Sequence, residues 1–288
     1  MSILLTDAIK LGNWSCYQAI KIQKKKDKKE RIGSNMTMSI PTKSEVNKEE
    51  LCFYGSDPGA VKHGNFINYY SFHDVQERIN NLHPQMFPTP IDNKLICLDI
   101  GCNTGDLTKA VYEYLKSLYP NCDIHILAVD IDSALIFRAK ESNSYPYITF
   151  STSNIMSEED RLPIIHFLKS YKRMKFDIVF CFSVTMWIHL NNGDNGLLEF
   201  LQYLKHISNT IVIEPQPWKC YRKAQKRVKK SGNTFELYNH LKIKSGVDII
   251  IENILKTDLY CKIYESPSSS WDRKVQSFQL TMESVNKC

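Results

Sequence analysis

The segment KLICLDIGCNTGDLTKAVYEYLKSL (residues 94–118) decides the fold of this chain. Its first seven residues are almost continuously apolar, which is typical of a strand buried on both faces of a parallel sheet. A turn containing Gly101 and Gly105 follows, and residues 106–118 have the spacing of a helix with one apolar face. The segment therefore predicts a strand–turn–helix unit of an α/β protein.

Similar units recur toward the C-terminus. Apolar runs that predict further strands lie at residues 124–131, 147–152, 176–182 and 210–215. Helix-compatible stretches separate them, at residues 133–142, 159–171 and 194–206. Because strands that alternate with helices form parallel sheets, we expect an α/β fold with a doubly wound, mostly parallel sheet. After a further helix at 247–256, the runs 259–265 and 275–282 predict strands that pair antiparallel.

The composition of the 288 residues is that of a globular protein, with 43% hydrophobic and 24% charged residues. The longest stretch without Asp, Glu, Lys or Arg runs from Ile178 to Gly193, which is shorter than the ~20 apolar residues that span a bilayer. Asp7 and Lys10 interrupt the N-terminal apolar residues, where a secretory signal needs an unbroken run. We therefore expect a cytoplasmic protein without membrane contact.

The nine cysteines are expected to be thiols in such a compartment. No Cys-x-x-Cys pair occurs, and the two most closely spaced cysteines, Cys97 and Cys102, lie in an apolar strand and the turn after it. Structural zinc sites need several thiolate or imidazole ligands at short spacing. We therefore expect no metal site.

Two dense basic segments account for much of the net charge of +6. KIQKKKDKKER (21–31) has almost no apolar residue and predicts a solvated arm, with a nucleic-acid tail or nuclear address as the alternative. We expect residues 1–60 to be a poorly ordered basic extension and residues 61–288 to form one domain. KCYRKAQKRVKK (219–230) instead repeats apolar residues at helical spacing before Gly232, which predicts a packed helix with a positive outer face and a polyanion partner.

The glycine turn after the first strand predicts a cofactor site. In a doubly wound sheet, ligands bind at the carboxyl ends of the strands, where Gly101 lets the backbone approach and Asp130 can accept both ribose hydroxyls. The turn lacks the Gly-x-Gly-x-x-Gly pattern of nicotinamide sites, and it carries Asp99 ahead of it and Asn103 within it. A negative charge there repels a pyrophosphate but suits an amino group, so the sequence predicts an S-adenosylmethionine site of the class I methyltransferase type.

Five longer strings occur in a distinctive order: HGNFINYYSFHDVQERINNL (63–82), LDIGCNTGDLT (98–108), SVTMWIHLNNGDNGL (183–197), EPQPWKCYRKA (214–224) and SSWDR (269–273). In order and spacing they resemble the Bicoid-interacting-3 family of RNA methyltransferases, over roughly residues 60–282. One branch of that family caps the γ-phosphate of small nuclear RNA, and the other methylates RNA 5′-monophosphates. At position 219 this chain has Lys, as in the branch that methylates 5′-monophosphates, whereas the capping branch more typically has a serine there.

The resemblance implies which residues contact adenosylmethionine. It places them at Arg78, Asn103, Asp130, Asn154, Ile155 and Phe182, in addition to Asp99 and Gly101 of the glycine turn. Asn154 stands where close relatives tend to have Asp, and Phe182 stands at a usual Met position. An asparagine carbonyl can still accept a hydrogen bond at position 154.

The predicted chemistry needs no catalytic base. A terminal phosphate with a second pKa near 6 is mostly dianionic at neutral pH, so its oxygen can attack the sulfonium methyl directly. The site should then offer hydrogen-bond donors to the other two phosphate oxygens, and we expect Thr185, His189, Lys219 and Tyr221 in this catalytic role. Arg222 and Lys223 are expected to guide RNA, with Trp187 or Trp218 stacking on its terminal base.

Plainer roles remain open for three of these residues. Arg78 could be a surface charge, and His189 and Trp187 could close the end of the fourth strand against the core. Taken together, the sequence predicts a monomeric cytoplasmic methyltransferase that acts on RNA with a 5′-monophosphate end, such as a transfer RNA for histidine or a microRNA precursor. The alternatives are γ-phosphate capping of a small nuclear RNA and a catalytically idle RNA-binding protein of the same fold.

Overall fold

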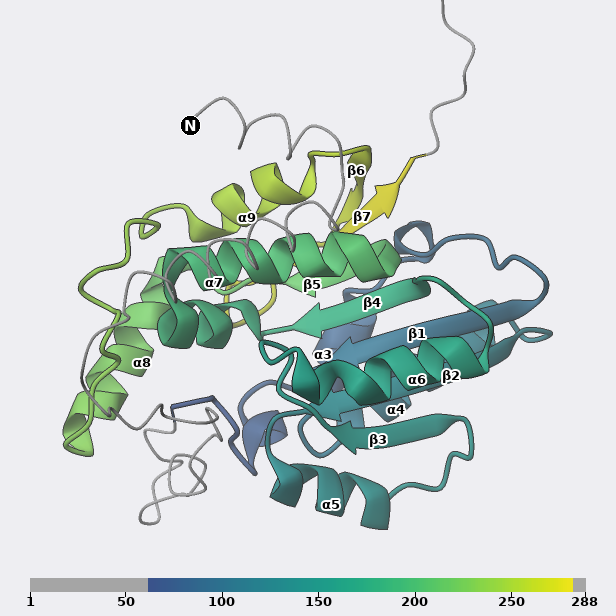
Figure 1. The fold of residues 1–288 in the computed structure, drawn as a ribbon, viewed down its shortest axis with the longest axis horizontal. Helices are drawn as coiled ribbons and strands as arrows, with labels where there is room; N and C mark the ends of the chain where they lie inside the picture. Colours follow the sequence, from purple (N-terminus) through teal and green to yellow (C-terminus); the bar gives the residue numbers. More distant parts are fainter. Residues whose placement is uncertain (1–61, 282–288) are drawn as a thin grey trace, which may run out of the picture. The chain divides into compact units, whose positions relative to one another are not determined.

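The computed structural model describes residues 62–281, which form one α/β domain (Figure 1). The predicted 1–60 extension, with its basic segment 21–31, lies outside these residues.

Seven strands of the described domain form one sheet in the order β3-β2-β1-β4-β5-β7-β6. Their bounds are Lys94–Ile100 (β1), Asp123–Asp130 (β2), Ile148–Thr152 (β3), Phe176–Phe182 (β4), Ser208–Glu214 (β5), Tyr260–Glu265 (β6) and Gln276–Leu280 (β7). Strands β1 to β5 are parallel, and β7 lies antiparallel between β5 and β6. The predicted doubly wound, mostly parallel sheet with an antiparallel C-terminal strand is therefore confirmed.

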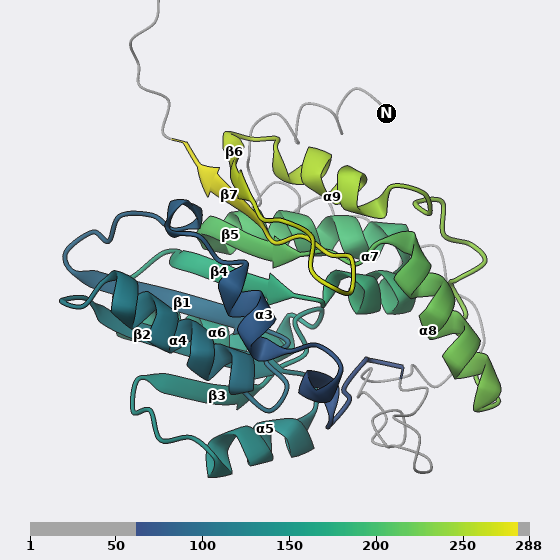
Figure 2. The same cartoon turned by 180° about the vertical axis from the view of Figure 1, so that it is seen from behind.

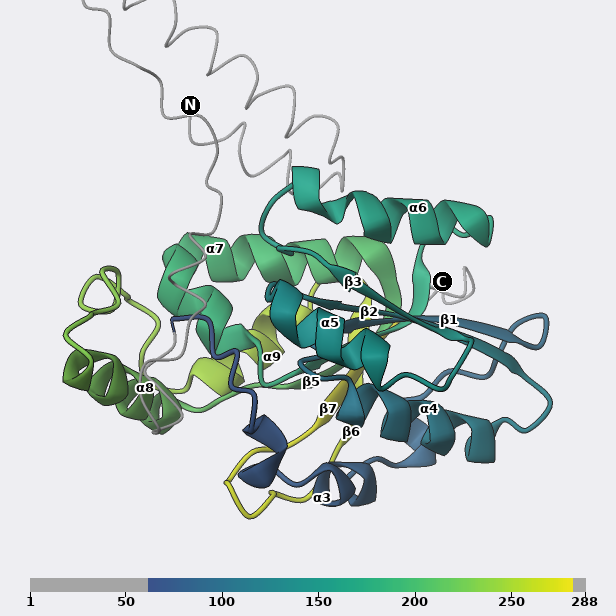
Figure 3. The same cartoon turned by 90° about the horizontal axis from the view of Figure 1, so that it is seen from below.

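Helices cover both faces of this sheet, as Figures 2 and 3 show. One apolar cluster joins the sheet to α6, α7, α8 and α9, and a second joins it to α3, α4 and α5. The helices are Val75–Asn80 (α3), Asp106–Leu118 (α4), Ser133–Glu141 (α5), Leu162–Ser170 (α6), Thr185–Ile207 (α7), Trp218–Lys230 (α8) and Val247–Leu255 (α9). β1 and β4 are buried on both faces because they lie at the centre of these two layers.

Helix α7 begins at Thr185, well before the predicted start at residue 194. The expected loop is helical because Asn191 and Asn192 do not break it: each side-chain amide donates to the carbonyl four residues earlier, at 2.9 Å. Gly193 has non-helical backbone angles, φ 70° and ψ −175°, so α7 consists of two helical stretches joined at a kink, and the second stretch begins after Gly193, where the prediction placed it. The carboxyl end of β4 therefore leads directly into a helix.

Three further features of the described residues bear on the sequence analysis. The predicted helix at 159–171 divides into a short 3-10 helix (Glu159–Arg161) and α6. Six cysteines lie in the described part of the chain, and all six are free thiols. Within residues 62–281, no helix combines the length and the apolar character needed to cross a membrane.

Gly105 is the position at which the β1 turn most needs a glycine. Its φ is 81°, and a Cβ there would lie 2.6 Å from the ring of Phe150. We expect Gly105→Ala to lower the free energy of unfolding by about 1–3 kcal/mol for the left-handed backbone, with a further penalty of about 1–3 kcal/mol for the overpacked ring. Urea unfolding measures the sum.

Gly232→Ala is the matched control. Its φ of 80° is almost the same, but nothing lies within 4 Å of the added Cβ. The difference between the two variants isolates the contact with Phe150. Equal destabilisation of the two variants would show that the close approach of this ring contributes nothing.

Candidate active site

The predicted cofactor-binding residues meet at the carboxyl edge of β1 and β2. Asp130, the last residue of β2, is buried, and its two carboxylate oxygens accept the backbone N–H groups of Asn103 at 2.9 Å and Asp132 at 3.0 Å. Each oxygen keeps a lone pair for a further donor. The carboxylate is thus held in place at the edge where this fold binds ligands.

Asn103 connects the glycine turn to the segment before the sheet. Its backbone lies in the left-handed region, with φ 52°. Its side-chain amide donates to the carbonyl of Phe66 at 2.9 Å, and its side-chain oxygen accepts the N–H of Thr104 at 2.8 Å. A parallel bond runs from the amide of Asn65 to Asp132, at 2.7 Å. Residues 65 and 66 are therefore clamped over the turn.

Burial dominates the electrostatics of the two acids here. It raises the pKa of Asp99 to about 6, against the hydrogen bond from Thr108 Oγ1 at 2.6 Å, which lowers it. Burial likewise raises the pKa of Asp130 to about 6, against the backbone bonds from Asp132 and Asn103. Both carboxylates are ionised at neutral pH but titrate just below it.

The remaining predicted cofactor residues surround the same turn. Gly101 has φ 78°, and a Cβ on it would lie 2.4 Å from Val184 Cγ2, so the turns after β1 and β4 pack tightly together. Asn154 and Ile155 follow β3, and the side-chain oxygen of Asn154 accepts the N–H of Met156 at 3.1 Å. Phe182 ends β4 with its ring buried and stacked on Phe180. The structure therefore brings these positions to one edge.

Arg78 occupies a buried polar cluster beside this edge. Its side chain is 1% exposed and donates to the carboxylate of Glu214, with Nη2 and Oε2 3.0 Å apart. It also donates to Tyr69 Oη at 2.8 Å and to Ser183 Oγ at 3.2 Å. It is thus not a surface charge, and the plainer role left open for it is wrong.

A second guanidinium, that of Arg273, enters the same cluster. Its Nη1 donates to Ser183 Oγ at 2.6 Å and lies 3.8 Å from Glu214, while its Nη2 lies 3.7 Å from Cys220 Sγ. Burial favours the neutral form of Glu214, but Arg78 and Arg273 together hold its pKa below its ordinary value. Two guanidinium groups therefore share the carboxylate of Glu214, and Arg78 also interacts electrostatically with Asp99.

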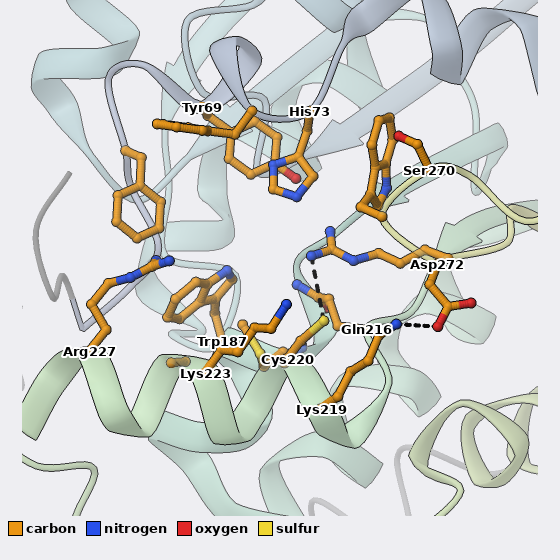
Figure 4. Close-up of a pocket in the computed structure, with 16 residues that line it drawn as sticks. Tyr69, His73, Trp187, Gln216, Lys219, Cys220, Lys223, Arg227, Ser270 and Asp272 are labelled. Atoms are coloured by element: carbon orange, nitrogen blue, oxygen red, sulfur yellow. Dashed lines mark hydrogen bonds and ion pairs between the residues drawn. The ribbon is translucent and has the colours of Figure 1, made fainter.

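Arg273 opens onto a cavity of about 530 Å³ (Figure 4). Arg273 Nε is buried without a hydrogen-bond partner among the described residues. The cavity walls are aromatic and basic, and they are formed by Phe66, Tyr69, Phe72, His73, Met186, Trp187, Gln216, Lys219, Cys220, Lys223, Ala224, Arg227, Ser270, Trp271, Asp272 and Arg273. Phe66 links the cavity to the glycine turn, because its carbonyl is the one that Asn103 binds.

Helix α8 supplies the basic wall, as predicted from its sequence. Lys219, Lys223 and Arg227 follow one another along its cavity side, and the Arg227 guanidinium lies 5.1 Å from the ring centroid of Phe66. Lys219 forms an ion pair with Asp272 across the cavity rim. Arg222 is exposed but does not line the cavity.

The opposite wall holds an uncharged histidine. Burial, reinforced by Arg273 and Arg78, lowers the pKa of His73 to about 4, so its ring is neutral at pH 7. The ring stacks on Tyr69 and meets the edge of Trp271. This wall therefore offers flat surfaces without adding charge.

Three predicted phosphate donors lie behind the cavity instead of lining it. Thr185, His189 and Tyr221 are fully buried. Thr185 Oγ1 donates to Gln216 Oε1 at 3.0 Å, and His189 joins Tyr221 Oη at 3.1 Å and Asp194 at 2.8 Å. These three side chains have no exposed surface, so they cannot contact a substrate in this structure. Their hydrogen bonds join α7 to α8 and to the loop after β5. We reassign them as positioning residues.

The two tryptophans also differ in position. Trp187 lines the cavity, whereas Trp218 stacks between Tyr221 and Tyr238 and does not. Sequence reasoning gave no role to Tyr69, His73, Trp271 or Arg273, although they stand in the strings 63–82 and 269–273. The available signal was the density of aromatic residues in the first string, where Phe66, Tyr69, Tyr70 and Phe72 fall within seven residues.

Comparisons with known proteins found two family models that match this chain. The Bicoid-interacting protein 3 (Bin3) family model matches residues 176–281, and a methyltransferase-domain model matches residues 98–211. A solved N-methyltransferase, NodS from Bradyrhizobium japonicum, is 13% identical with a TM-score of 0.46, over 75% of this chain and 99% of its own.

Curated relatives are considerably closer in sequence. The pre-miRNA 5′-monophosphate methyltransferase of Xenopus laevis is 42% identical over 78% of this chain and 94% of its own length. The RNA 5′-monophosphate methyltransferase of Homo sapiens is 39% identical, with 77% and 82% covered. The U6 snRNA methylphosphate capping enzyme Amus of Drosophila melanogaster is 32% identical, with 64% and 61% covered. The chain belongs to the Bicoid-interacting protein 3 family of RNA methyltransferases.

Proposed function

We propose that this protein transfers a methyl group from adenosylmethionine to the 5′-terminal monophosphate of RNA. The observation that carries the proposal is that the guanidinium of Arg273, which shares Glu214 with Arg78, lines an aromatic and basic cavity beside the glycine turn. A cation in a cavity wall attracts an anion, and a terminal phosphate is a compact dianion. The relatives from Xenopus laevis and Homo sapiens act on 5′-monophosphate ends by name.

The residues at the carboxyl edge fit adenosylmethionine, which when bound supplies a methyl group activated by a sulfonium. Asp130 is fixed by two backbone bonds and retains acceptor capacity for ribose hydroxyls. Gly101 lets a ligand approach the backbone, and Asn103 holds residue 66 over the turn. We propose Asn154, Ile155 and Phe182 as further contacts, and Arg78 and Asp99 as buried groups that set the charge around them.

The reaction then depends on positioning. A dianionic phosphate oxygen is nucleophilic without a base. We propose that Arg273 and Lys219 hold two phosphate oxygens and leave the third free to attack in line, an arrangement that supplies about 7–11 kcal/mol in favourable cases. Trp187 offers a stacking surface for the terminal base, and Lys223 and Arg227 lie where the following phosphates would pass.

The setting of this activity is a further part of the proposal. We propose a monomer that works in the cytoplasm, on substrates such as microRNA precursors or a transfer RNA for histidine. The six free thiols in the described residues are compatible with a reducing compartment.

Capping of a small nuclear RNA is the second candidate. The observation that favours it is the 32% identity to the capping enzyme from Drosophila melanogaster. A capping substrate would present a triphosphate-derived γ-phosphate, which stands two phosphate units further from the base. The number of phosphates at the 5′ end of the RNA substrate therefore distinguishes the two candidate functions.

Replacement of Asp130 tests the cofactor site. Asp130→Ala should weaken adenosylmethionine by about 2–3 kcal/mol, since hydrogen bonds to a charged acceptor contribute about 1.5–3 kcal/mol. Isothermal titration calorimetry on the folded variant measures this. Affinity within twofold of wild type would remove Asp130 from the site, and complete absence of cofactor binding in the wild type would favour an idle RNA-binding protein.

Cofactor binding should also depend on pH. The pKa of Asp130 is raised to about 6, and the ionised carboxylate is the stronger acceptor. Bound hydroxyls lower that pKa, so affinity should be constant above pH 6 and should fall as the pH drops through about 6. The affinity for adenosylmethionine is measured across this pH range for wild type and for Asp130→Asn. Any pH dependence of affinity that remains in the variant is assigned to Asp99.

A panel of matched RNAs with 5′-hydroxyl, 5′-monophosphate and 5′-triphosphate ends tests the substrate. We expect methyl transfer to the monophosphate and none to the hydroxyl, whose high pKa leaves it without a nucleophilic oxygen. Arg273→Gln and Lys219→Ala should each lower the rate on the monophosphate, Arg273→Gln by about 10- to 100-fold, with cofactor affinity retained. Preference for the triphosphate would assign the chain to the capping branch.

The outer face of α8 is expected to hold the RNA body. Replacing Lys226, Lys229 and Lys230 with Gln should weaken the binding of all RNAs equally and reduce the log–log salt slope by roughly 0.7 for each phosphate that is no longer bound. A control variant with the same change in charge replaces Lys140 on α5, Lys169 on α6 and Lys172 in the turn after α6 with Gln. This variant should leave the salt slope unchanged. Equal slopes in the two triple variants would make this face an ordinary solvated surface.

A further inference from the structure

We propose that Asp272 sets the number of phosphates that the cavity accepts, by disfavouring ends that carry more than one. The inference rests on the proposed function and concerns the same cavity. Among the described residues that line the cavity, Asp272 is the only acid, and it lies beside Lys219 at one end of the basic wall of α8 (Figure 4).

The carboxylate of Asp272 neutralises the lysine nearest to it. It pairs with Lys219 Nζ across the rim, and both side chains are partly open to solvent. An incoming phosphate must therefore share Lys219 with a resident anion. The other cations of the cavity wall are Lys223 and Arg227, which have no carboxylate partner among the described residues, and Arg273, which shares Glu214 with Arg78.

The charges that remain match a short anionic end. With His73 neutral and Asp272 cancelling Lys219, the lining keeps the charges of Lys223 and Arg227, together with Arg273, which shares Glu214 with Arg78. A 5′-monophosphate carries a charge of about −2 at neutral pH, which the charges of Lys223 and Arg227 match. A triphosphate adds roughly two further negative charges, which the lining does not compensate.

Asp272 cannot easily withdraw from the rim, because its loop is anchored on several sides. Its own N–H donates to Ser269 O at 2.8 Å, and Ser269 also receives the N–H of Arg273 on its hydroxyl at 3.1 Å. Ser270 Oγ donates to Glu77 on α3 at 2.8 Å, and Trp271 Nε1 donates to Glu214 at 3.1 Å. The negative charge is thereby fixed where additional phosphates would lie.

Two neighbouring residues of this tight turn therefore have different roles toward the phosphates. Arg273 reaches inward to the buried cluster, and its neighbour Asp272 turns outward to the rim with φ 64°. Arg273 attracts the first phosphate, and Asp272 repels any further phosphates of the 5′ end. Because asparagine tolerates this left-handed backbone as well as aspartate does, Asp272→Asn changes the charge with little change in conformation.

The test compares kcat/KM on matched monophosphate and triphosphate RNAs. Asp272→Asn should lower the ratio of monophosphate to triphosphate activity by roughly fivefold, as expected for one charge removed within several ångströms of the added phosphates. Lys219→Gln should raise the ratio, since it leaves Asp272 unneutralised. Glu141→Gln, an exposed change of equal charge on α5, should leave the ratio unchanged.

The ratio distinguishes the inference from the proposed function. If wild type prefers the monophosphate but the ratio in Asp272→Asn stays within twofold of it, Asp272 does not read phosphate number and the inference is overturned. If wild type prefers the triphosphate, the proposed function itself fails. A thermal shift with adenosylmethionine confirms that each variant is folded and that its cofactor site is intact.

Discussion

The buried carboxylate of Glu214 is the interaction on which the site depends. It ends β5, and it binds Arg78 from α3, Arg273 from the loop before β7, and Trp271 from the same loop. A buried carboxylate requires paired charges and full hydrogen bonding to be tolerated. Meeting that requirement draws three segments distant in sequence to one sheet edge, and it places Arg273 in the wall of the cavity.

The cofactor turn and the cavity are mechanically connected through the segment before the sheet. Asn103 binds the carbonyl of Phe66, while the ring of Phe66 lines the cavity and lies under Arg227. Gly64 packs beneath Trp187 so closely that a Cβ there would overlap the indole. One short segment thus forms part of both binding sites, which fixes the distance between them.

The sequence predicts the sheet well because the strands are apolar on both faces and short glycine turns separate them from helices. The helical stretch before Gly193 could not be predicted, since Asn191 and Asn192 signal a loop but bond to carbonyls of the preceding turn, whereas the stretch after the Gly193 kink follows the prediction. Residue type also predicted the basic wall of α8. It did not distinguish Lys219, which lines the cavity, from His189 and Tyr221, which are buried behind it, because side-chain direction depends on how α8 packs against α7.

The antiparallel insertion of β7 between β5 and β6 has a consequence for biosynthesis. Arg273 and Trp271 lie just before β7, so they reach the cluster at Glu214 only when the last strand of the sheet pairs with β5. A ribosome-bound chain that has completed β1 to β5 already has its glycine turn but lacks the residues that close the cavity. Because contacts between segments distant in sequence form late, the cavity is complete only once β7 has paired with β5.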